Sequence, residues 1–364
     1  MRKAPVFCAV MAVLLALALG GLLLPDRERS ELENRVLSQA PAFSWAGMRD
    51  GRFTDALETY TADQLPLRDG FVSIYTASEA LLGRRASEGV IRGGDGRLFD
   101  RTDGWKERNV AQNAQALNEL SEKTGLPVYL LAVPSGAAVY PEALPAYAPM
   151  QDEEALLRAA GEKTALIPLL PLLLAEKAKT AAPLYYRTDH HWTAAGARAG
   201  YLAVCEALGL EALAEEGYRD YPGFFGSYYA RFPLPWMQSD VFSSPVEDSL
   251  SLTVAGEEKD GILDPEAVLG RDKYAALFYG NHPVMELANS QAPDRTLFVI
   301  KDSYANALLP ALSRHYRRIV AVDARYFTQD VVEAAKNSKG DAILCVYGLS
   351  TLSSGRTIAL LEGL

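Results

Sequence analysis

The sequence predicts an α/β fold in which a parallel β-sheet carries helices on both faces. Two observations lead to this prediction. Continuous apolar runs at 128–133, 296–300, 318–322 and 342–346 are typical of strands that are buried on both faces. Helical patterns of about a dozen residues stand beside these runs, and such alternation is typical of parallel strands connected by helices.

The composition is that of an ordinary globular protein. The chain has 364 residues, of which 49% are apolar and 23% charged, enough for one large or two modest domains. Its net charge of −10 argues against a sequence-independent grip on nucleic acid, so we expect no nucleic-acid partner. The three cysteines, Cys8, Cys205 and Cys345, are too few and too scattered for a disulfide framework or a zinc site. We expect Cys205 and Cys345 to be small core residues.

The N-terminus predicts export. Arg2 and Lys3 precede an uncharged run from Ala4 to Leu24, which is long enough to cross a bilayer as a helix. Positive charges before such a run predict a cytoplasmic N-terminus and a body outside. Ala16-Leu17-Ala18 also fits a cleavage site. The sequence therefore leaves two alternatives open: an uncleaved signal anchor with an extracellular domain, or a cleaved signal peptide and secretion.

We divide the chain into three parts. Residues 1–25 are the anchor or signal peptide, residues 26–52 a charged and proline-containing tether, and residues 53–364 the α/β domain. Residues 211–293 interrupt the alternation of strands and helices, and we interpret them as an insertion with short strands. This insertion contains an aromatic cluster, made of Tyr218, Tyr221, Phe224, Phe225, Tyr228, Tyr229, Phe232, Trp236 and Phe242.

The elements of the domain are predicted in order. Helical patches in 53–82 flank a break at Gln64–Asp69, and glycines at 93–96 predict a hairpin over 90–99. Thr193 is expected to be the N-cap of a helix that runs to Leu208. The other helices are predicted at 107–123, 152–163, 172–179, 304–314 and 328–337, with a last helix at the C-terminus.

Two neighbouring histidines follow a carboxylate in Asp189-His190-His191, just before the helix that begins after Thr193. A general base needs a neutral imidazole and an acceptor that holds one of its tautomers. Asp189 supplies that acceptor if the backbone bends so that its carboxylate reaches Nδ1 of His191. A plain surface turn with solvated histidines is the alternative on this stretch alone.

Ligands of open α/β sheets bind beyond the carboxyl ends of the strands. One strand ends at Lys301-Asp302-Ser303-Tyr304, where a serine begins the next helix. There a hydroxyl is exposed, and the backbone N–H groups that follow it are expected to receive an oxyanion. A serine at this place can also be only an N-cap. The other strand exits carry Arg325 and the pair Ser350-Thr351.

These motifs resemble the DHHW family, which is similar to alginate O-acetyltransferase-like proteins of the SGNH hydrolase superfamily. The resemblance rests on Tyr185–Gly196, which contains Asp-His-His-Trp, and on Ile300–Tyr304, which contains Asp-Ser-Tyr. Two further stretches fit it, Gly94–Phe99 and Gly280–Pro283, so that it covers roughly residues 30 to 350. It implies an SGNH-hydrolase-like α/β sheet with an aromatic-rich insertion, preceded by one membrane helix.

The resemblance implies a catalytic triad in which Ser303 is the nucleophile, His191 the base and Asp189 its orienting carboxylate. Lys301 departs from the family pattern, because ordinary SGNH enzymes have glycine there. The oxyanion-hole residues of ordinary members have no clear match. The substrate or oxyanion candidates are Arg325, Tyr304, Asn281, His282 and Ser350.

The function implied is an exported, serine-dependent O-acyl (acetyl) transferase or esterase that acts on a cell-envelope or extracellular polysaccharide. Its partners would be a polysaccharide acceptor, an acyl donor, for instance one delivered by a membrane-bound acyltransferase, and the membrane that holds the N-terminal helix. We expect neither a metal nor another cofactor.

Two rival interpretations stay open. Asp-His-His also occurs in the DHH phosphoesterases, which bind manganese, but such sites need further carboxylates at strand exits, and the chain offers chiefly Asp302 and Asp323. The second rival is a non-catalytic polysaccharide-binding or envelope-assembly protein on the same fold, with the aromatic insertion as a surface on which sugar rings stack. Ser135, after the strand at 128–133, is a weaker candidate nucleophile than Ser303, and His315 is expected at the surface.

Overall fold

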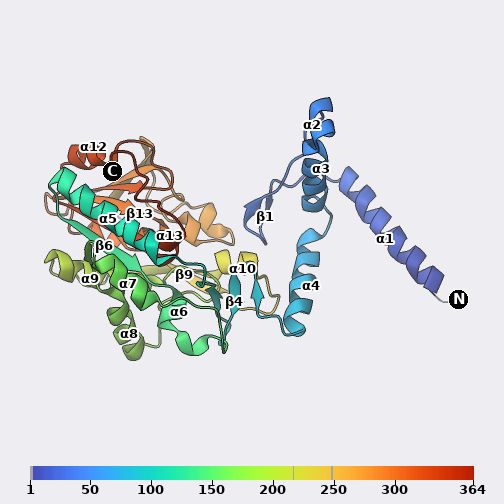
Figure 1. Ribbon diagram of the computed structural model, residues 1–364, viewed down its shortest axis with the longest axis horizontal. Coiled ribbons are helices and arrows are strands. Elements are labelled where there is room, and N and C mark those ends of the chain that lie inside the picture. The colour runs from blue at the N-terminus through green and yellow to red at the C-terminus, as the bar shows by residue number, and fades with distance from the viewer. Residues whose placement is uncertain (1–2, 216, 247–248) are drawn as a thin grey trace. The chain divides into compact units, whose positions relative to one another are not determined.

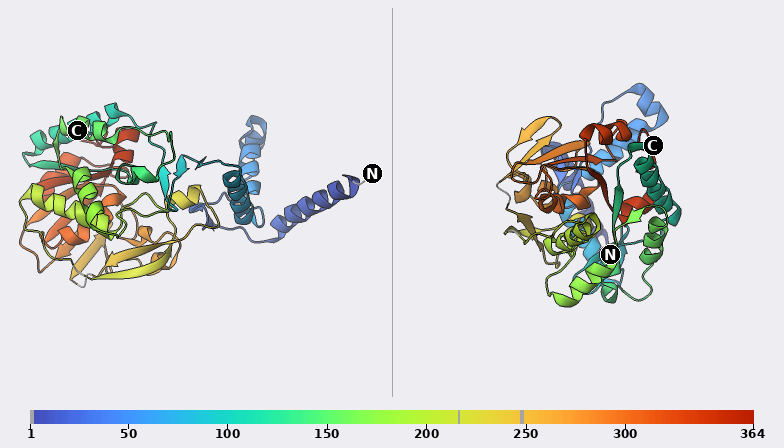
Figure 2. Two further views of the ribbon diagram at one scale, coloured as in Figure 1. Left: turned by 90° about the horizontal axis from the view of Figure 1, so that it is seen from below. Right: turned by 90° about the vertical axis from the view of Figure 1, so that its left-hand side faces the viewer.

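The computed structural model describes residues 3–215, 217–246 and 249–364 (Figures 1 and 2). It divides into two compact units, Met1–Glu88 with Tyr229–Met237, and Gly89–Tyr228 with Gln238–Leu364. The α/β unit therefore begins at Gly89, and the domain start predicted at about residue 53 lies inside the first unit.

The second unit is built on an eight-stranded sheet. The strand order is β11-β10-β12-β14-β13-β15-β6-β7, and neighbours from β14 to β7 are all parallel. These parallel strands are β6 (Val128–Val133), β7 (Ala165–Leu166), β13 (Thr296–Lys301), β14 (Arg318–Asp323) and β15 (Ala342–Gly348). Every residue of β15 is buried. The predicted α/β fold is confirmed, because strands without a polar face must be covered on both sides.

The insertion extends the same sheet in antiparallel fashion. β12 pairs with β14, β10 with β12 and β11 with β10, each antiparallel. These strands are β10 (Leu250–Val254), β11 (Glu257–Lys259) and β12 (Val284–Asn289), while β8 (Tyr218–Phe224) and β9 (Asp240–Pro245) form a separate ribbon. The sheet is thus mixed rather than purely parallel. Hairpin connections such as the one between β10 and β11 are short, and only antiparallel pairing permits them.

Helices cover both faces of the sheet, and each face has its own core. α5, α7, α12 and α13 pack on one core with Leu130 and Ile300, whereas α8, α9 and α11 pack on the other with Leu131 and Val299. The two cores use alternate residues of the same strands because side chains alternate across a strand. The helices are α5 (Glu107–Thr124), α7 (Glu153–Gly161), α8 (Leu169–Lys179), α9 (Ala194–Leu208), α11 (Leu309–Leu312), α12 (Val331–Ser338) and α13 (Leu349–Ser354).

The short elements of this unit connect and brace the sheet. β4 (Val90–Arg92) and β5 (Leu98–Asp100) form the expected hairpin. The remaining elements are α6 (Gly136–Val139), α10 (Ser227–Arg231) and the 3-10 helices η1 (Pro141–Ala143), η2 (Ala267–Leu269), η3 (Tyr274–Ala276) and η4 (Ser303–Ala307). Cys205 and Cys345 are buried, free thiols, as expected.

The prediction of one continuous helix over 304–314 is wrong. A 3-10 helix, η4, is followed by the four-residue helix α11, and Pro310 lies in the first turn of α11. Proline has no N–H to donate to the preceding turn, so one α-helix cannot run unbroken through this position.

The first unit holds the N-terminal helix and three further helices, and ion pairs hold α3 and α4 to residues 33–35. α1 (Lys3–Leu23) is long and apolar enough to cross a membrane, by length and composition. The nearly buried carboxylate of Asp63 binds Arg35 and the Ser38 N–H, and Arg68 pairs with Glu33. The unit's other elements are β1 (Arg29–Ser30), β2 (Arg35–Val36), α2 (Trp45–Asp50), α3 (Arg52–Asp63), α4 (Arg68–Leu81) and β3 (Ala86–Ser87).

The aromatic cluster of the insertion is mostly core. Phe224, Tyr228, Tyr229, Phe232 and Phe242 are buried. Only Tyr218 and Trp236 are exposed among the aromatic residues named for this cluster, at 41% and 50%. The two belong to different compact units. Within the second unit, Tyr218 is therefore the one exposed aromatic residue of this cluster.

Asn113 anchors the C-terminal segment, and its loss tests the fold. The amide Nδ2 donates to the carbonyls of Leu352 and Gly355 at 2.9 and 2.8 Å, and Oδ1 accepts from the N–H groups of Ile358 and Ala359. Asn113→Ala should lower the free energy of unfolding by about 2–4 kcal/mol, because it leaves buried backbone groups unpaired. Urea unfolding followed by circular dichroism measures this change.

Asn118, on the same helix, is the matched control because its amide bonds only to the exposed Glu122. Asn118→Ala should change the free energy of unfolding by less than about 0.5 kcal/mol. An equally small effect at Asn113 would contradict the anchoring role.

Candidate active site

Ser303 stands at the carboxyl end of β13, in a turn held by the side chain of Asp302. This carboxylate is the N-cap of η4 and accepts from the Tyr304 N–H at 2.9 Å. Its other oxygen accepts from the Gly348 N–H at 2.9 Å and the Thr351 hydroxyl at 3.0 Å. Asp302 therefore ties the serine turn to the exit of the neighbouring strand, β15. Burial raises the pKa of Asp302, and these donors counteract that effect.

The Asp189–His191 segment is held by a second buried carboxylate, Asp240. Asp240 Oδ2 accepts from the N–H of Thr188 at 2.8 Å and from its hydroxyl at 2.7 Å, and the Arg187 N–H also points at this carboxylate. Beyond His191, the fully buried Trp192 donates from Nε1 to the Tyr304 carbonyl at 3.1 Å. The histidine segment is thus bonded directly to the serine turn.

Asp189, His191 and Ser303 meet in one hydrogen-bonded chain. His191 Nδ1 lies 2.5 Å from Asp189 Oδ1, and His191 Nε2 lies 2.7 Å from Ser303 Oγ. Both distances are within the reach expected of a nucleophile, a base and a third group that orients the base. The two segments come together although 112 positions separate His191 from Ser303.

Backbone N–H donors and the close approach of Gly226 fix the orientation of the Asp189 carboxylate. It accepts from the His191 N–H at 2.9 Å and from the Ser227 N–H at 2.7 Å. A Cβ atom on Gly226 would lie 2.3 Å from Asp189, so glycine is the residue that fits here. With its oxygens bound by three N–H donors, the carboxylate is oriented before any substrate arrives.

The imidazole of His191 lies between two aromatic rings. Tyr274 stacks on it at 3.7 Å between centroids and 11°, and His190 lies at 3.7 Å and 37°. Two tyrosine hydroxyls then bond across the site: Tyr274 donates to the Ser303 carbonyl at 3.0 Å and Tyr304 to the His190 carbonyl at 2.7 Å. The ring of His191 is therefore restrained in its plane as well as at both nitrogens.

Electrostatics favour a neutral His191 beside an ionised Asp189. Burial, and then the charge of His190, lower the pKa of His191 to about 4. Burial works to raise the pKa of Asp189, but the two imidazoles hold it well below its usual range. Partial burial works to lower the pKa of His190, but the adjacent carboxylate raises it above the ordinary value. A neutral imidazole is the form that can accept a proton from serine.

The backbone around Ser303 offers one N–H donor. Within the described residues no hydrogen bond engages the Ser303 N–H, while the Tyr304 N–H is taken by Asp302. The expectation that the N–H groups after the serine receive an oxyanion is therefore wrong for Tyr304. The reason is that Asp302 caps η4 from inside the turn.

The other candidate residues have local partners of their own or are exposed. Arg325, at the exit of β14, is held to Asp323 through Nε at 2.9 Å and Nη2 at 2.6 Å. Asn281 is exposed, and Nε2 of His282 lies 3.0 Å from the Tyr279 carbonyl. Ser350 lies in the first turn of α13, which follows β15. Within the described residues, none of these side chains hydrogen-bonds to the triad.

Two further residues have structural partners. Ser135 is the N-cap of α6 and bonds to the buried Glu153, whose pKa burial raises to about 7. His315 is buried rather than exposed, and its Nε2 lies 2.7 Å from the Tyr201 hydroxyl. The surface position expected of His315 is wrong, because Tyr201 in α9 covers it.

Sequence reasoning missed Asp240, Ser227, Gly226 and Tyr274. All four lie in the insertion, where no motif marks them. No local sequence pattern identifies these residues. Only the folded structure shows that each contacts a triad residue or the turn that carries one.

The donor atoms of Asp189, His190 and His191 all lie within 4.8 Å of one another. Nδ1 of His191 is bonded to Asp189 and Nδ1 of His190 to Ser227, and the carboxylate accepts three N–H bonds. Asp302 and Asp323 are occupied by their own partners. These side chains thus fit an Asp–His–Ser arrangement better than the ligand set of a manganese phosphoesterase.

Two family models match the chain over this site. The SGNH hydrolase-like domain of the acetyltransferase AlgX matches residues 90–227, and the DHHW protein model matches residues 173–322. Together the two matches extend from residue 90 to residue 322, so this part of the chain is similar to the SGNH hydrolase-like and DHHW proteins. The DHHW match includes Asp189, His191 and Ser303.

The chain is also similar to individual curated proteins. The probable alginate O-acetylase AlgJ of Pseudomonas aeruginosa is 30% identical over 217 residues, which are 53% of this chain and 50% of the relative. AlgJ of Pseudomonas syringae is 27% identical over 173 residues, 45% of this chain and 44% of the relative. The chain thus spans about half the length of the curated relatives it matches.

Solved structures show the same fold. A DHHW family protein from Eubacterium siraeum superposes with a TM-score of 0.61 at 20% identity, over 74% of this chain and 97% of its own. PatB1 of Bacillus cereus superposes with a TM-score of 0.60 at 21% identity, over 72% of this chain and 97% of its own.

Gly226→Ala tests whether the packing around Asp189 controls the reactivity of the Ser303 hydroxyl. The added methyl group would meet Asp189 at 2.3 Å and push the carboxylate off His191. The rate at which phenylmethanesulfonyl fluoride modifies Ser303 should fall at least about tenfold, because the base loses its orientation. Gly217→Ala is the control, since its Cβ would meet no atom within 4 Å. Equal rates in both variants would contradict the packing argument.

The pH dependence of the same modification tests the charge state of His191. The reaction needs neutral His191, so its rate should be constant around neutral pH and fall as the pH drops towards about 4, rather than around the ordinary value of 6.5. Circular dichroism at each pH verifies that the protein stays folded.

His190→Gln removes the charge that lowers the pKa of His191. The pH at which the modification rate falls to half of its neutral-pH value should therefore be higher in this variant. A half-point near 6.5 in the unmodified protein, unchanged by His190→Gln, would contradict the electrostatic argument.

Proposed function

We propose that this chain is an exported, serine-dependent O-acyltransferase or esterase that moves an acetyl group on a cell-envelope or extracellular polysaccharide. The observation that carries the proposal is the chain of contacts from Asp189 through His191 to Ser303, at 2.5 and 2.7 Å. Such a chain turns an ordinary serine into a nucleophile.

The proposed first half-reaction is acylation of Ser303. Nε2 of His191 takes the hydroxyl proton while Oγ attacks the carbonyl carbon of the acyl donor. The oxygen that becomes negative accepts from the Ser303 N–H, which has no other partner among the described residues. The carbon–oxygen bond to the leaving alcohol then breaks, and His191 returns the proton to that alcohol. The product is an acetyl ester of Ser303.

The second half-reaction releases the acetyl group. His191 takes a proton from an acceptor hydroxyl, whose oxygen attacks the serine ester. The bond to Ser303 Oγ breaks, and the proton passes from His191 to the serine. A sugar hydroxyl as acceptor makes the protein a transferase, and water makes it an esterase. Which one prevails depends on how far water is excluded from the site.

Several side chains are proposed to support these steps without reacting. Tyr274 and His190 hold the His191 ring between them, and Asp302 fixes the serine turn. Arg325, held to Asp323 at the next strand exit, is proposed to bind an oxygen of the acyl donor or the acceptor. Burial raises the pKa of Tyr274 and Tyr304 well above the ordinary value, so both hydroxyls stay protonated and can donate.

The substrate class rests on the relatives. Those in Pseudomonas are named as probable alginate O-acetylases, which supports acetyl as the group and a polysaccharide as the acceptor. We propose that the acyl donor is an acetyl ester or thioester, for instance one delivered by a membrane-bound acyltransferase. The apolar helix α1 supports anchoring in the cell membrane with the catalytic unit outside.

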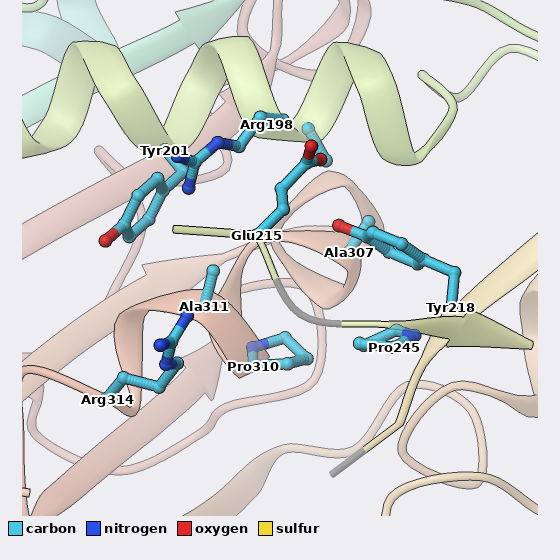
Figure 3. Close-up of a pocket in the computed structure, with 10 residues that line it drawn as sticks. Arg198, Tyr201, Glu215, Tyr218, Pro245, Ala307, Pro310, Ala311 and Arg314 are labelled. Atoms are coloured by element: carbon cyan, nitrogen blue, oxygen red, sulfur yellow. The ribbon is translucent and has the colours of Figure 1, made fainter. Parts of the chain in front are cut away.

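The geometry favours the enzyme over a pure polysaccharide binder. Most of the aromatic cluster is core, as described above. Tyr218 lines a small hollow beside α9, and no triad residue belongs to its lining (Figure 3). The residues lining this hollow are Ala197, Arg198, Tyr201, Glu215, Tyr218, Pro245, Ala307, Pro310, Ala311 and Arg314.

Ser303→Ala tests the assigned nucleophile. The purified protein is incubated with p-nitrophenyl acetate, and both nitrophenol release and acetyl mass on the Ser303 peptide are measured. The variant should lose the acetylated peptide and at least about 10³-fold in rate, because the three groups act as a unit. Ser354→Ala is the control, since this exposed serine bonds only to a backbone carbonyl of its own helix.

Equal turnover by the unmodified protein and Ser303→Ala would reject Ser303 as the nucleophile. No turnover by either, together with measurable polysaccharide binding, would favour the binding protein. Adding an alginate or envelope oligosaccharide to the assay separates the two enzyme activities, because a transferase yields acetylated sugar and an esterase yields free acetate.

A further inference from the structure

Helix α4 has one packed face and one exposed apolar face. Thr76 and Ala80, on one face, are buried. Along the other face runs a stripe of exposed apolar residues, which we call the α4 stripe: Leu67, Phe71, Ile74, Tyr75, Leu81 and Leu82. Their spacing of three and four places them on one side of the helix. Ile74 and Leu82 are 68% and 84% exposed. A continuous apolar face along a helix is typical of one that packs against another apolar surface.

The α4 stripe is tied to the end of α1 by hydrogen bonds. The Arg27 N–H donates to Gln64 Oε1 at 2.9 Å, and Gln64 Nε2 donates back to the Arg27 carbonyl at 3.0 Å. The Arg27 side chain pairs with Asp69, in the first turn of α4, at 3.2 Å. One residue earlier, Asp26 accepts from the Tyr60 hydroxyl at 2.9 Å. The chain that leaves α1 is therefore fastened where α3 ends and α4 begins.

This attachment limits how far α4 can lie from a membrane that α1 crosses. Only a short loop separates Leu23, the last residue of α1, from Arg27. Fully extended, that loop spans at most ~14 Å. Leu67, the first residue of the stripe, is close in sequence to Gln64 and caps α4. The start of α4 is thus held close to the headgroup layer, which is about 5–8 Å thick on each side of the hydrocarbon core.

We propose that the α4 stripe lies on the outer surface of the same bilayer, with its side chains in the boundary between headgroups and acyl chains. This inference rests on the proposed anchoring of α1. Side chains of this kind enter that boundary by about 5–10 Å. Tyr75 suits the interface, since its ring is apolar and its hydroxyl polar. Arg85, which is exposed, follows the stripe and would meet the phosphates of anionic lipids.

Docking of α4 would hold the first unit against the membrane. A unit fixed at the bilayer presents the chain to substrates that arrive at the membrane surface. The segment between α1 and the α/β unit would then be bound to the membrane surface and would not act as a flexible tether.

The experiment measures how deep single residues lie in lipid. The full chain is reconstituted into vesicles of phosphatidylcholine and phosphatidylglycerol, labelled on one cysteine with the fluorophore NBD, and quenched by lipids that carry a nitroxide on the acyl chain. Cys8, the exposed native cysteine in α1, reports the anchor. Ile74→Cys in a Cys8→Ser background reports the stripe, because Cys205 and Cys345 are buried. Glu122→Cys in that background is the matched control on the exposed side of α5.

Quenching at position 74 should be at least about twofold stronger than at position 122, since only the former lies among acyl chains. Quenching at Cys8 with none at position 74 would overturn the docking of α4 and leave the anchor standing. No quenching at either position would overturn both. Protection of position 74 that requires a second membrane protein would assign the stripe to a protein partner and also overturn the proposal. Acetylation of Ser303, measured on the same vesicles, reports the proposed catalytic function independently.

Discussion

The bond between Asp189 and His191 is the interaction on which the site depends. It decides which nitrogen of the imidazole carries a proton, and so leaves Nε2 as an acceptor towards Ser303. The bond is only useful if the carboxylate cannot turn away. Gly226 and Ser227 prevent this, one through its missing side chain and the other through its N–H. A short local motif therefore functions through residues brought to it by the fold.

The sheet brings the two halves of the site together. β13 delivers Ser303 at its carboxyl end, and the segment before α9 delivers His191 at the same edge. Their attachment is direct, because Trp192 donates to the Tyr304 carbonyl and the Tyr304 hydroxyl donates to the His190 carbonyl. Asp302 extends this connection to β15. Movement of either turn alone would break several buried bonds, which explains how a serine and a histidine so distant in sequence keep a fixed separation.

The insertion is part of the active centre as well as of the core. It adds antiparallel strands to one side of the sheet, and it supplies Asp240, Ser227 and Tyr274 to the triad segments. Its aromatic residues serve both purposes, since Tyr274 packs with Phe242 on one side and stacks on His191 on the other. Lys301, at the end of β13, is a polar residue that is also part of the core. Its ammonium group is fully buried against Asn306, and burial lowers its pKa to about 8.

The sequence by itself determined the alternation of buried strands and amphipathic helices, because burial on both faces demands continuous apolar runs such as 128–133 and 342–346. It also determined local features, such as the caps at Thr193 and Gly125 and the hairpin before α5, which depend on a few neighbouring residues. The identity of the triad candidates was accessible because Asp189 and His191 are neighbours and Ser303 stands at a strand exit. Tertiary structure alone decided which residues restrain them. Tyr274, Gly226 and Asp240 act through contacts between segments far apart in the chain, and no local pattern encodes such contacts. Tertiary structure likewise decided the antiparallel extension of the sheet and the burial of His315, since pairing and burial depend on what the rest of the chain packs against each segment.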